Sequence, residues 1–203
     1  YSIDATLIDL SLAIFPWAKF ALGKGAVKLH MGLDHDGLIP AFAVVTDSRV
    51  METTMARHLR LPKGSIAVFD RGYRDGRWFK TLDDTGVLFV TRLRAGTRYE
   101  TQRAHETGAD AGVVSDEIIR LTGKSATTCG MPDLRLVTFD CRETGKRYQF
   151  LSNIHHLAAS TIASGIVYSS SGPRTSSDIR SQAARIFSSS VASVKLSSQM
   201  SPT

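Results

Sequence analysis

The chain has 203 residues and a mass of 22.1 kDa, with 42% hydrophobic and 22% charged residues. This composition is typical of a globular protein and excludes fibrous, collagen-like and wholly disordered chains. A membrane-spanning helix needs about 18 or more consecutive apolar residues, and the sequence contains no such run. The net charge of +6 favours a polyanionic partner such as nucleic acid.

Cysteine content and the first residues bear on location. Cys129 and Cys141 are too few for a disulfide framework and have no metal-ligand spacing, which predicts reduced cytosolic thiols. Tyr1 opens directly on a patterned segment, without a basic and apolar leader, so we expect no export. Because an initiating Met is absent, we also expect an upstream piece of the protein to be missing.

Residues 1–94 show strands and helices in a definite order. Residues 2–10, 26–33 and 38–45 are rich in β-forming residues and predict three consecutive antiparallel strands. Apolar residues at helical spacing then predict two helices, each followed by a short apolar run typical of a buried central strand, 66–69 and 87–90. The helix markers are Met51, Met55 and Leu59 in the first helix and Trp78, Phe79 and Leu82 in the second. This order predicts a mixed α/β sheet of the kind found in ribonuclease-H-like enzymes.

The composition changes after residue 94 and again after residue 163. Residues 95–155 contain polar, glycine-bearing stretches and three further strand-like segments, which predict a β-rich insertion. Residues 156–163 are interpreted as the start of a return to the core. Residues 164–203 contain 14 serines, against eight in residues 1–163, and have no sustained apolar periodicity. We expect this tail to be largely disordered, because it has little apolar surface to bury.

Two aspartates are placed where a metal ion could bind. Asp4 lies inside the first strand, where a carboxylate is poorly solvated unless something pairs with it. Asp70 directly follows the buried run 66–69, at the strand end where α/β sheets usually open their active sites. Carboxylates at the ends of neighbouring strands could converge on divalent metal. Alternatively, Asp4 makes a hydrogen bond at a strand edge and Asp70 simply begins a turn.

Five segments, in this order and spacing, resemble the DDE transposases of the IS4 type, which bacterial insertion sequences encode. They are YSIDATLIDLSL, FPWAKF, GAVKLHMGLDHDG, VFDRGY and FVTRLR, and the resemblance runs from Tyr1 to about Ala163. It implies a ribonuclease-H-like catalytic core, with Asp4 as the first acid and Asp70 as the second, both binding Mg²⁺ or Mn²⁺. It also implies double-stranded DNA, both terminal inverted repeats and target DNA, as the partner, and a bacterial cytoplasmic, nucleoid-associated location. A homodimer is compatible with it, and a membrane partner is not expected.

Five further residues are candidates for contacts with DNA phosphates. Alternation along a strand places Lys28 and His30 on one face, and the others lie at or near strand ends. Each has a structural alternative: a histidine satisfied within the sheet, a core tyrosine with its hydroxyl bonded, or a solvated strand end. The five candidates are Lys28, His30, Arg71, Tyr73 and Arg92.

The third acidic residue that the resemblance implies has no matching residue in this sequence. The implied signature is Tyr, two residues, Arg, three residues, Glu, six residues, Lys, yet the last glutamate of the chain is Glu143. If Tyr168 stood for the signature tyrosine, the Arg, Glu and Lys positions would hold Ser171, Thr175 and Gln182. We therefore expect a fold incomplete at the C-terminus, a chain inactive in strand cleavage, and a tail that is an out-of-frame reading. We also expect the amino-terminal DNA-binding region that the resemblance implies to be missing from this chain.

Three readings of the function stay open at this point. The first is a transposase catalytic domain that cleaves a DNA phosphodiester and transfers the strand. The second is a non-catalytic transposase remnant that binds DNA electrostatically. The third, a ribonuclease-H-like nuclease of unrelated role, has only the expected fold in its favour.

Overall fold

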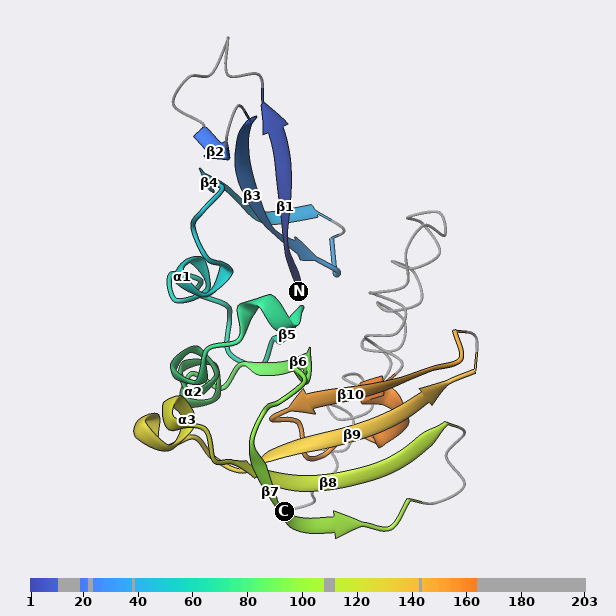
Figure 1. Ribbon diagram of the computed structural model, residues 1–203. Coiled ribbons are helices and arrows are strands. Elements are labelled where there is room, and N and C mark those ends of the chain that lie inside the picture. Colours follow the sequence, from blue (N-terminus) through green and yellow to red (C-terminus); the bar gives the residue numbers. More distant parts are fainter. Residues whose placement is uncertain (11–18, 22–23, 38, 108–111, 143, 164–203) are drawn as a thin grey trace, which may run out of the picture. The chain divides into compact units, whose positions relative to one another are not determined.

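Figure 1 shows the computed structural model, which describes residues 1–10, 19–21, 24–37, 39–107, 112–142 and 144–163. The chain divides into two compact units. The first unit comprises Tyr1–Phe89 and Lys124–Met131, and the second comprises Val90–Gly123 and Pro132–Thr203. The segment FPWAKF falls partly, and the tail 164–203 wholly, outside the described residues.

The first unit is built on a mixed β-sheet. β1 lies between β3, with which it pairs antiparallel, and β5, with which it pairs parallel. The other edge of β3 pairs antiparallel with β4, and β3 also pairs with β2. The strands are β1 (Ser2–Leu10), β2 (Lys19–Ala21), β3 (Lys24–Asp34), β4 (Ile39–Asp47) and β5 (Ile66–Phe69). The three predicted antiparallel strands are thus confirmed as β1, β3 and β4.

The first unit also contains short helices. They are α1 (Glu52–Ala56), the 3₁₀ helix η1 (Arg71–Tyr73), α2 (Gly76–Asp84) and α3 (Lys124–Cys129). α2 packs Trp78, Phe79 and Leu82 inward, as their helical spacing predicted. These side chains join Phe69 and Phe89 in an aromatic core, with ring centroids 4.5 Å apart for Phe69 and Trp78 and 4.9 Å apart for Phe79 and Phe89.

The first predicted helix is shorter than its apolar spacing indicated. α1 ends at Ala56, and Leu59 lies beyond it. Ala56 is the buried residue of this helix, while Met51 before it is 64% exposed. The predicted apolar face therefore gains little stability from burial. A helix this short usually needs such burial, because its own propensity is too weak to stabilise it.

The second unit is an antiparallel meander. β6 (Leu88–Arg92) begins in the first unit and ends in the second, where it pairs antiparallel with β10. The remaining strands, β7 (Tyr99–His105), β8 (Val113–Leu121), β9 (Leu134–Cys141) and β10 (Lys146–Ser152), pair in sequence order (Figure 1). Ile119, Leu134, Leu136 and Phe150 are fully buried among them.

Two elements of the expected insertion have no strong sequence signal. β7 is exposed along almost its whole length, so it lacks the alternation that marks a half-buried strand. α3 belongs to the first unit and packs against α2 at Gly76, where an added Cβ would lie 3.2 Å from Ser125 Oγ. The insertion proposed for 95–155 stays a prediction, and the return segment 156–163 lies in the second unit. Among the described residues, no helix is long and apolar enough to cross a membrane.

Candidate functional site

Asp4 and Asp70 lie next to each other on neighbouring parallel strands. The register of β1 and β5 pairs Ser2 with Val68 and Ile3 with Phe69. Asp4 follows Ile3 within β1, and Asp70 directly follows the last residue of β5, where the backbone is still extended, with φ −75° and ψ 162°. Adjacent strands are about 4.8 Å apart. The fold thus brings together two acids that are far apart in the sequence.

The two carboxylates point to the same face of the sheet. Their preceding neighbours Ile3 and Phe69 are buried in the core, and successive side chains of a strand alternate between faces. Both aspartates are exposed to solvent. The expectation that Asp4 is poorly solvated is therefore wrong, because its side chain leaves the sheet on the face opposite the aromatic core.

Neither aspartate forms an ion pair within the described part of the chain. Asp4 Oδ1 accepts a hydrogen bond from the Ala5 amide at 2.8 Å, and the Asp70 side chain does not cap η1. Most of their oxygen lone pairs therefore face solvent. Two carboxylates with free oxygens fit Mg²⁺ or Mn²⁺, which bind one or two carboxylates and retain several waters.

Glu52 is an acid near this site that sequence reasoning missed. It is the first residue of α1, and its Oε1 accepts a hydrogen bond from Lys28 Nζ at 2.9 Å. Its Cδ lies 3.8 Å from the position that a Cβ on Gly72 would take, so it lies against η1 directly after Asp70. Nothing in the spacing of Glu52 from either aspartate in the sequence signals this proximity.

Tyr73 lies within electrostatic reach of all three acids. Its side chain is 2% exposed, and among the described residues its hydroxyl has no hydrogen-bond partner. Burial raises the pKa of the phenol far above its ordinary value, and the negative charges of Asp4, Glu52 and Asp70 raise it further. Tyr73 is thus a neutral core residue, which is not available at the surface to contact DNA.

Lys28 and His30 share a face, as alternation predicted, but it is the inner face. β3 pairs Met31 with Asp4, so the side chains of Lys28 and His30 lie on the side opposite Asp4. His30 is 1% exposed and bonds Thr46 Oγ1 through Nε2 at 3.0 Å. Lys28 is engaged by Glu52 and by the Val50 carbonyl at 2.8 Å. The structure gives both side chains internal partners in place of DNA phosphates.

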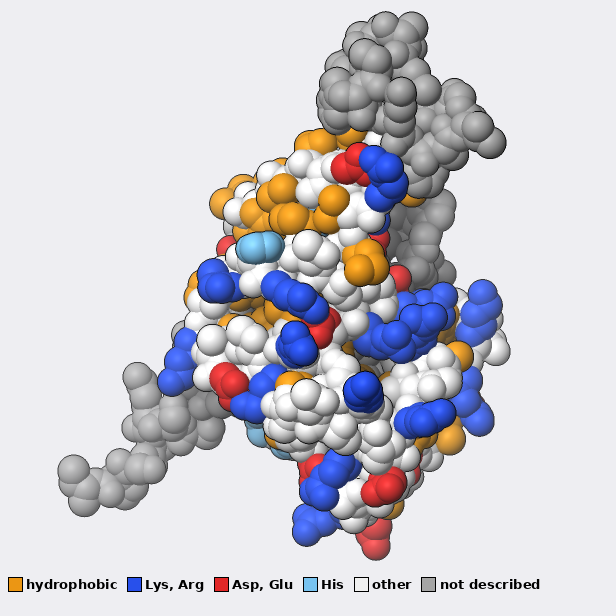
Figure 2. Space-filling model, turned by 60° about the vertical axis from the view of Figure 1, so that its left-hand side comes forward, with side chains coloured by type: hydrophobic (Ala, Val, Ile, Leu, Met, Phe, Trp, Pro, Cys, Tyr) orange, Lys and Arg blue, Asp and Glu red, His pale blue; other side chains and the backbone are white. Residues whose placement is uncertain are grey.

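The two remaining candidates, Arg71 and Arg92, differ in their surroundings. Arg71 is exposed in η1, next to Asp70. In the second unit, the Arg92 guanidinium lies over the Tyr148 ring at 5.1 Å from its centroid, a cation–π contact. On one face of the surface, Lys and Arg side chains outnumber acidic ones (Figure 2), in agreement with the net charge of +6. The contacts of both arginines with DNA stay predictions.

The described residues do not complete a third metal ligand. Within the described ranges, no three His, Cys, Asp or Glu side chains are grouped closely enough to hold a metal ion. Glu52 is held by Lys28 and does not form such a group with Asp4 and Asp70.

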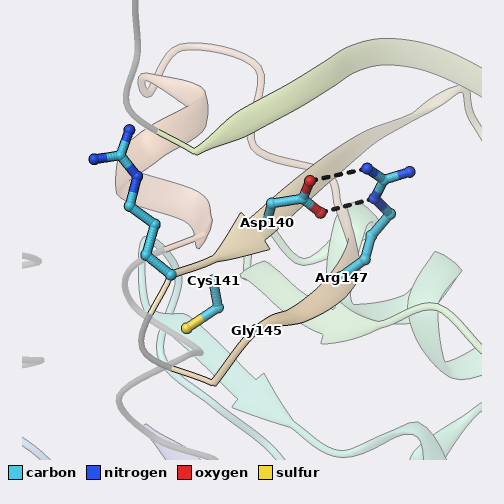
Figure 3. Close-up of a pocket in the computed structure, with 5 residues that line it drawn as sticks. Asp140, Cys141, Gly145 and Arg147 are labelled. Atoms are coloured by element: carbon cyan, nitrogen blue, oxygen red, sulfur yellow. Dashed lines mark hydrogen bonds and ion pairs between the residues drawn. The ribbon is translucent and has the colours of Figure 1, made fainter.

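A hollow of about 490 Å³ at the turn between β9 and β10 is separate from these residues (Figure 3). Its lining residues are Asp140, Cys141, Arg142, Gly145 and Arg147. Arg147 donates two hydrogen bonds to the Asp140 carboxylate, at 2.7 and 2.8 Å, so both charges are already paired.

Comparisons with known proteins identify the family of this chain. Residues 1–178 match the family described as Transposase DDE domain, so the match continues past Ala163, where the sequence resemblance ends. The chain is also 28% identical over 165 residues to "Putative transposase y4zB" of Sinorhizobium fredii (strain NBRC 101917 / NGR234), covering 79% of this chain and 46% of that protein. The chain thus spans about half the length of this curated relative. The paired aspartates lie inside the matched region, and the chain belongs to the Transposase DDE domain family.

Proposed function

We propose that this chain is the catalytic part of an IS4-type DDE transposase, with Asp4 and Asp70 as its metal-binding pair. The observation that carries the proposal is the register of β1 and β5, which sets the two exposed carboxylates side by side. Family membership supports the same reading. The proposed reaction is metal-dependent cleavage of a phosphodiester at insertion-sequence ends, followed by strand transfer. The proposed partners are terminal inverted repeats and target DNA, bound in the bacterial cytoplasm by a homodimer.

The proposed chemistry needs little covalent participation from the protein. Asp4 and Asp70 would hold Mg²⁺ or Mn²⁺ together with water molecules. Such an ion, when bound, supplies charge neutralisation at the phosphate and lowers the pKa of a bound water. The contribution of the two aspartates is to fix the position of that charge at the end of β5.

We also propose that the chain as given is inactive in cleavage. The chain contains no glutamate after Glu143, and the second ion of a two-metal site would lose its main ligand. An out-of-frame tail is the proposed cause, and because the family match continues to residue 178, the change of frame would lie beyond Ala163. The nucleotide sequence tests it: if neither alternative frame after the Ala163 codon encodes a Trp- and Phe-rich segment with Glu, the proposal of a frameshift is wrong.

Mn²⁺ titration followed by electron paramagnetic resonance tests the metal site. We expect Asp4→Asn and Asp70→Asn each to weaken Mn²⁺ binding by at least the ~10-fold that loss of an outer-shell partner costs. Asp36→Asn, which changes an exposed acid in a turn, is the matched control and should bind as the unchanged chain does. Equal binding by all variants would show that the two aspartates do not form the site.

Nicking of supercoiled plasmid in Mn²⁺ tests the activity. We expect no nicking above the level of the Asp4→Asn/Asp70→Asn double variant. If the unchanged chain nicks the plasmid and Asp70→Asn does not, the proposed inactivity is wrong, while the proposed metal site is still supported.

The missing third acid favours a second candidate function, a non-catalytic remnant that binds DNA through its basic surface. Its signature is duplex binding that weakens as salt rises, without metal-dependent cleavage. Cleavage restored by an in-frame repair of the tail would instead assign the transposase function to the parent gene.

A further inference from the structure

We infer that Glu52, held by Lys28, is a positioning residue that fixes η1 and, through it, the direction of the Asp70 carboxylate. This inference rests on the proposed metal site, because it assigns how one of the two ligands of that site is held.

The first step is the ion pair itself. Lys28 Nζ donates to Glu52 Oε1 at 2.9 Å and to the Val50 carbonyl at 2.8 Å. The side chains of Lys28 and Glu52 are only 12% and 30% exposed. The ammonium group of Lys28 in β3 thus holds both the residue two positions before α1 and the first residue of α1. Hydrogen bonds from a charged donor are stronger than neutral ones, and this ammonium group is partly buried.

The second step links Glu52 to Asp70. α1 packs against η1, and the Glu52 side chain lies against Gly72. The Tyr73 amide donates to the Asp70 carbonyl at 3.1 Å and closes the turn, while the Tyr73 ring is anchored beside Phe69 and Trp78. η1 is therefore held by Tyr73 on its core side and by Glu52 on its α1 side. Asp70 connects the end of β5 to η1, so the position of η1 affects the direction of its carboxylate.

The third step distinguishes positioning from metal ligation. The Glu52 carboxylate already has a cation as its partner, and it forms no three-group metal cluster with other described residues. Two substitutions separate the roles. Glu52→Gln keeps an oxygen that accepts from Lys28, and Lys28→Met removes a positive charge close to the site.

Mn²⁺ titration of folded protein provides the test. We expect Glu52→Ala and Lys28→Met each to weaken Mn²⁺ binding by about tenfold, as loss of an outer-shell partner does. Glu52→Gln should retain most of the affinity. If Lys28 acted only through its positive charge, Lys28→Met would bind Mn²⁺ more tightly than the unchanged chain. That result would contradict the inference.

The controls separate this inference from the proposed function. Asp84→Ala removes the acid of an exposed lysine ion pair in the same unit and should leave Mn²⁺ binding unchanged. If Asp70→Asn loses Mn²⁺ and Glu52→Ala does not, only the positioning role is wrong. If the unchanged chain shows no Asp70-dependent binding, both proposals are wrong. If Glu52→Gln binds Mn²⁺ as weakly as Asp70→Asn does, then Glu52 is a metal ligand and the inferred positioning role is wrong. Should Glu52→Ala fail to fold, Lys28→Met and Glu52→Gln still give opposite expected results.

Discussion

His30 is the titratable residue most enclosed by the sheet of the first unit. Burial lowers its pKa, the positive charge of Lys28 lowers it further, and Glu52 offsets only part of this. The folded pKa is below the unfolded value of about 6.5, so the unfolded chain binds the proton first as pH falls. We expect the free energy of unfolding to decrease as pH drops below about 6.5 and to level off below the folded pKa. Urea unfolding between about pH 8 and pH 5 measures this.

The matched variants for His30 are His30→Asn, which cannot titrate, and His58→Asn, which changes an exposed histidine. We expect the first to flatten the pH dependence and the second to leave it unchanged. An unaltered slope in His30→Asn would show that other groups cause the pH dependence.

At the scale of an element, Asp75 determines where α2 begins. Its Oδ1 accepts from the Arg77 amide at 2.9 Å, and its Oδ2 accepts from Arg57 Nε at 2.7 Å. We expect Asp75→Ala to lower the free energy of unfolding by about 1–2 kcal/mol, mainly from the lost N-cap. Asp75→Asn should cost less because Asn also caps, and the ion pair adds little since the Arg57 side chain is 54% exposed.

Denaturant unfolding checks this prediction. Asp84→Asn, at the exposed end of α2, is the control and should change stability by no more than about 0.5 kcal/mol. Equal losses from Asp75→Ala and Asp75→Asn would mean that the charge, and not the cap, stabilises the helix.

At the scale of the whole molecule, the second unit depends on a buried ion pair. Arg135 donates to both oxygens of Asp116, at 2.8 and 2.7 Å, and also to the carbonyls of Ile154 and Leu157. These contacts join β8, β9 and the segment after β10. We expect Arg135→Met to cost about 3–5 kcal/mol, because it leaves the Asp116 charge buried without its partner. Hydrogen exchange of the β8 and β9 amides measures the loss.

The exposed pair of Arg147 and Asp140 is a control with the same geometry. Its two hydrogen bonds have nearly the same lengths, but its side chains are 62% and 48% exposed, against 7% and 9% for Arg135 and Asp116. Arg147→Met should therefore cost at most about 1 kcal/mol. Similar costs for both substitutions would contradict the assigned effect of burial.

Local pattern was sufficient for several elements. α2 has an apolar spacing that matches its buried side, whereas β1, β3 and β4 were predicted from their content of β-forming residues, even though β4 has no buried residue. β7 is polar and forms through backbone pairing with β8, which no local pattern reveals. The packing of α3 against α2 was not predicted either, because it depends on contact between segments that are distant in the chain.

The same division holds for the site. The sequence predicted that Asp4 lies inside a strand and that Asp70 directly follows a buried apolar run, and both aspartates match the motifs of the transposase family. The fold added the register that pairs β1 with β5 before the two aspartates, the inward direction of Lys28 and His30, and the position of Glu52 against η1. The physical reason is that alternation along a strand is a local property of the chain, whereas register and helix docking depend on which distant surfaces bury each other.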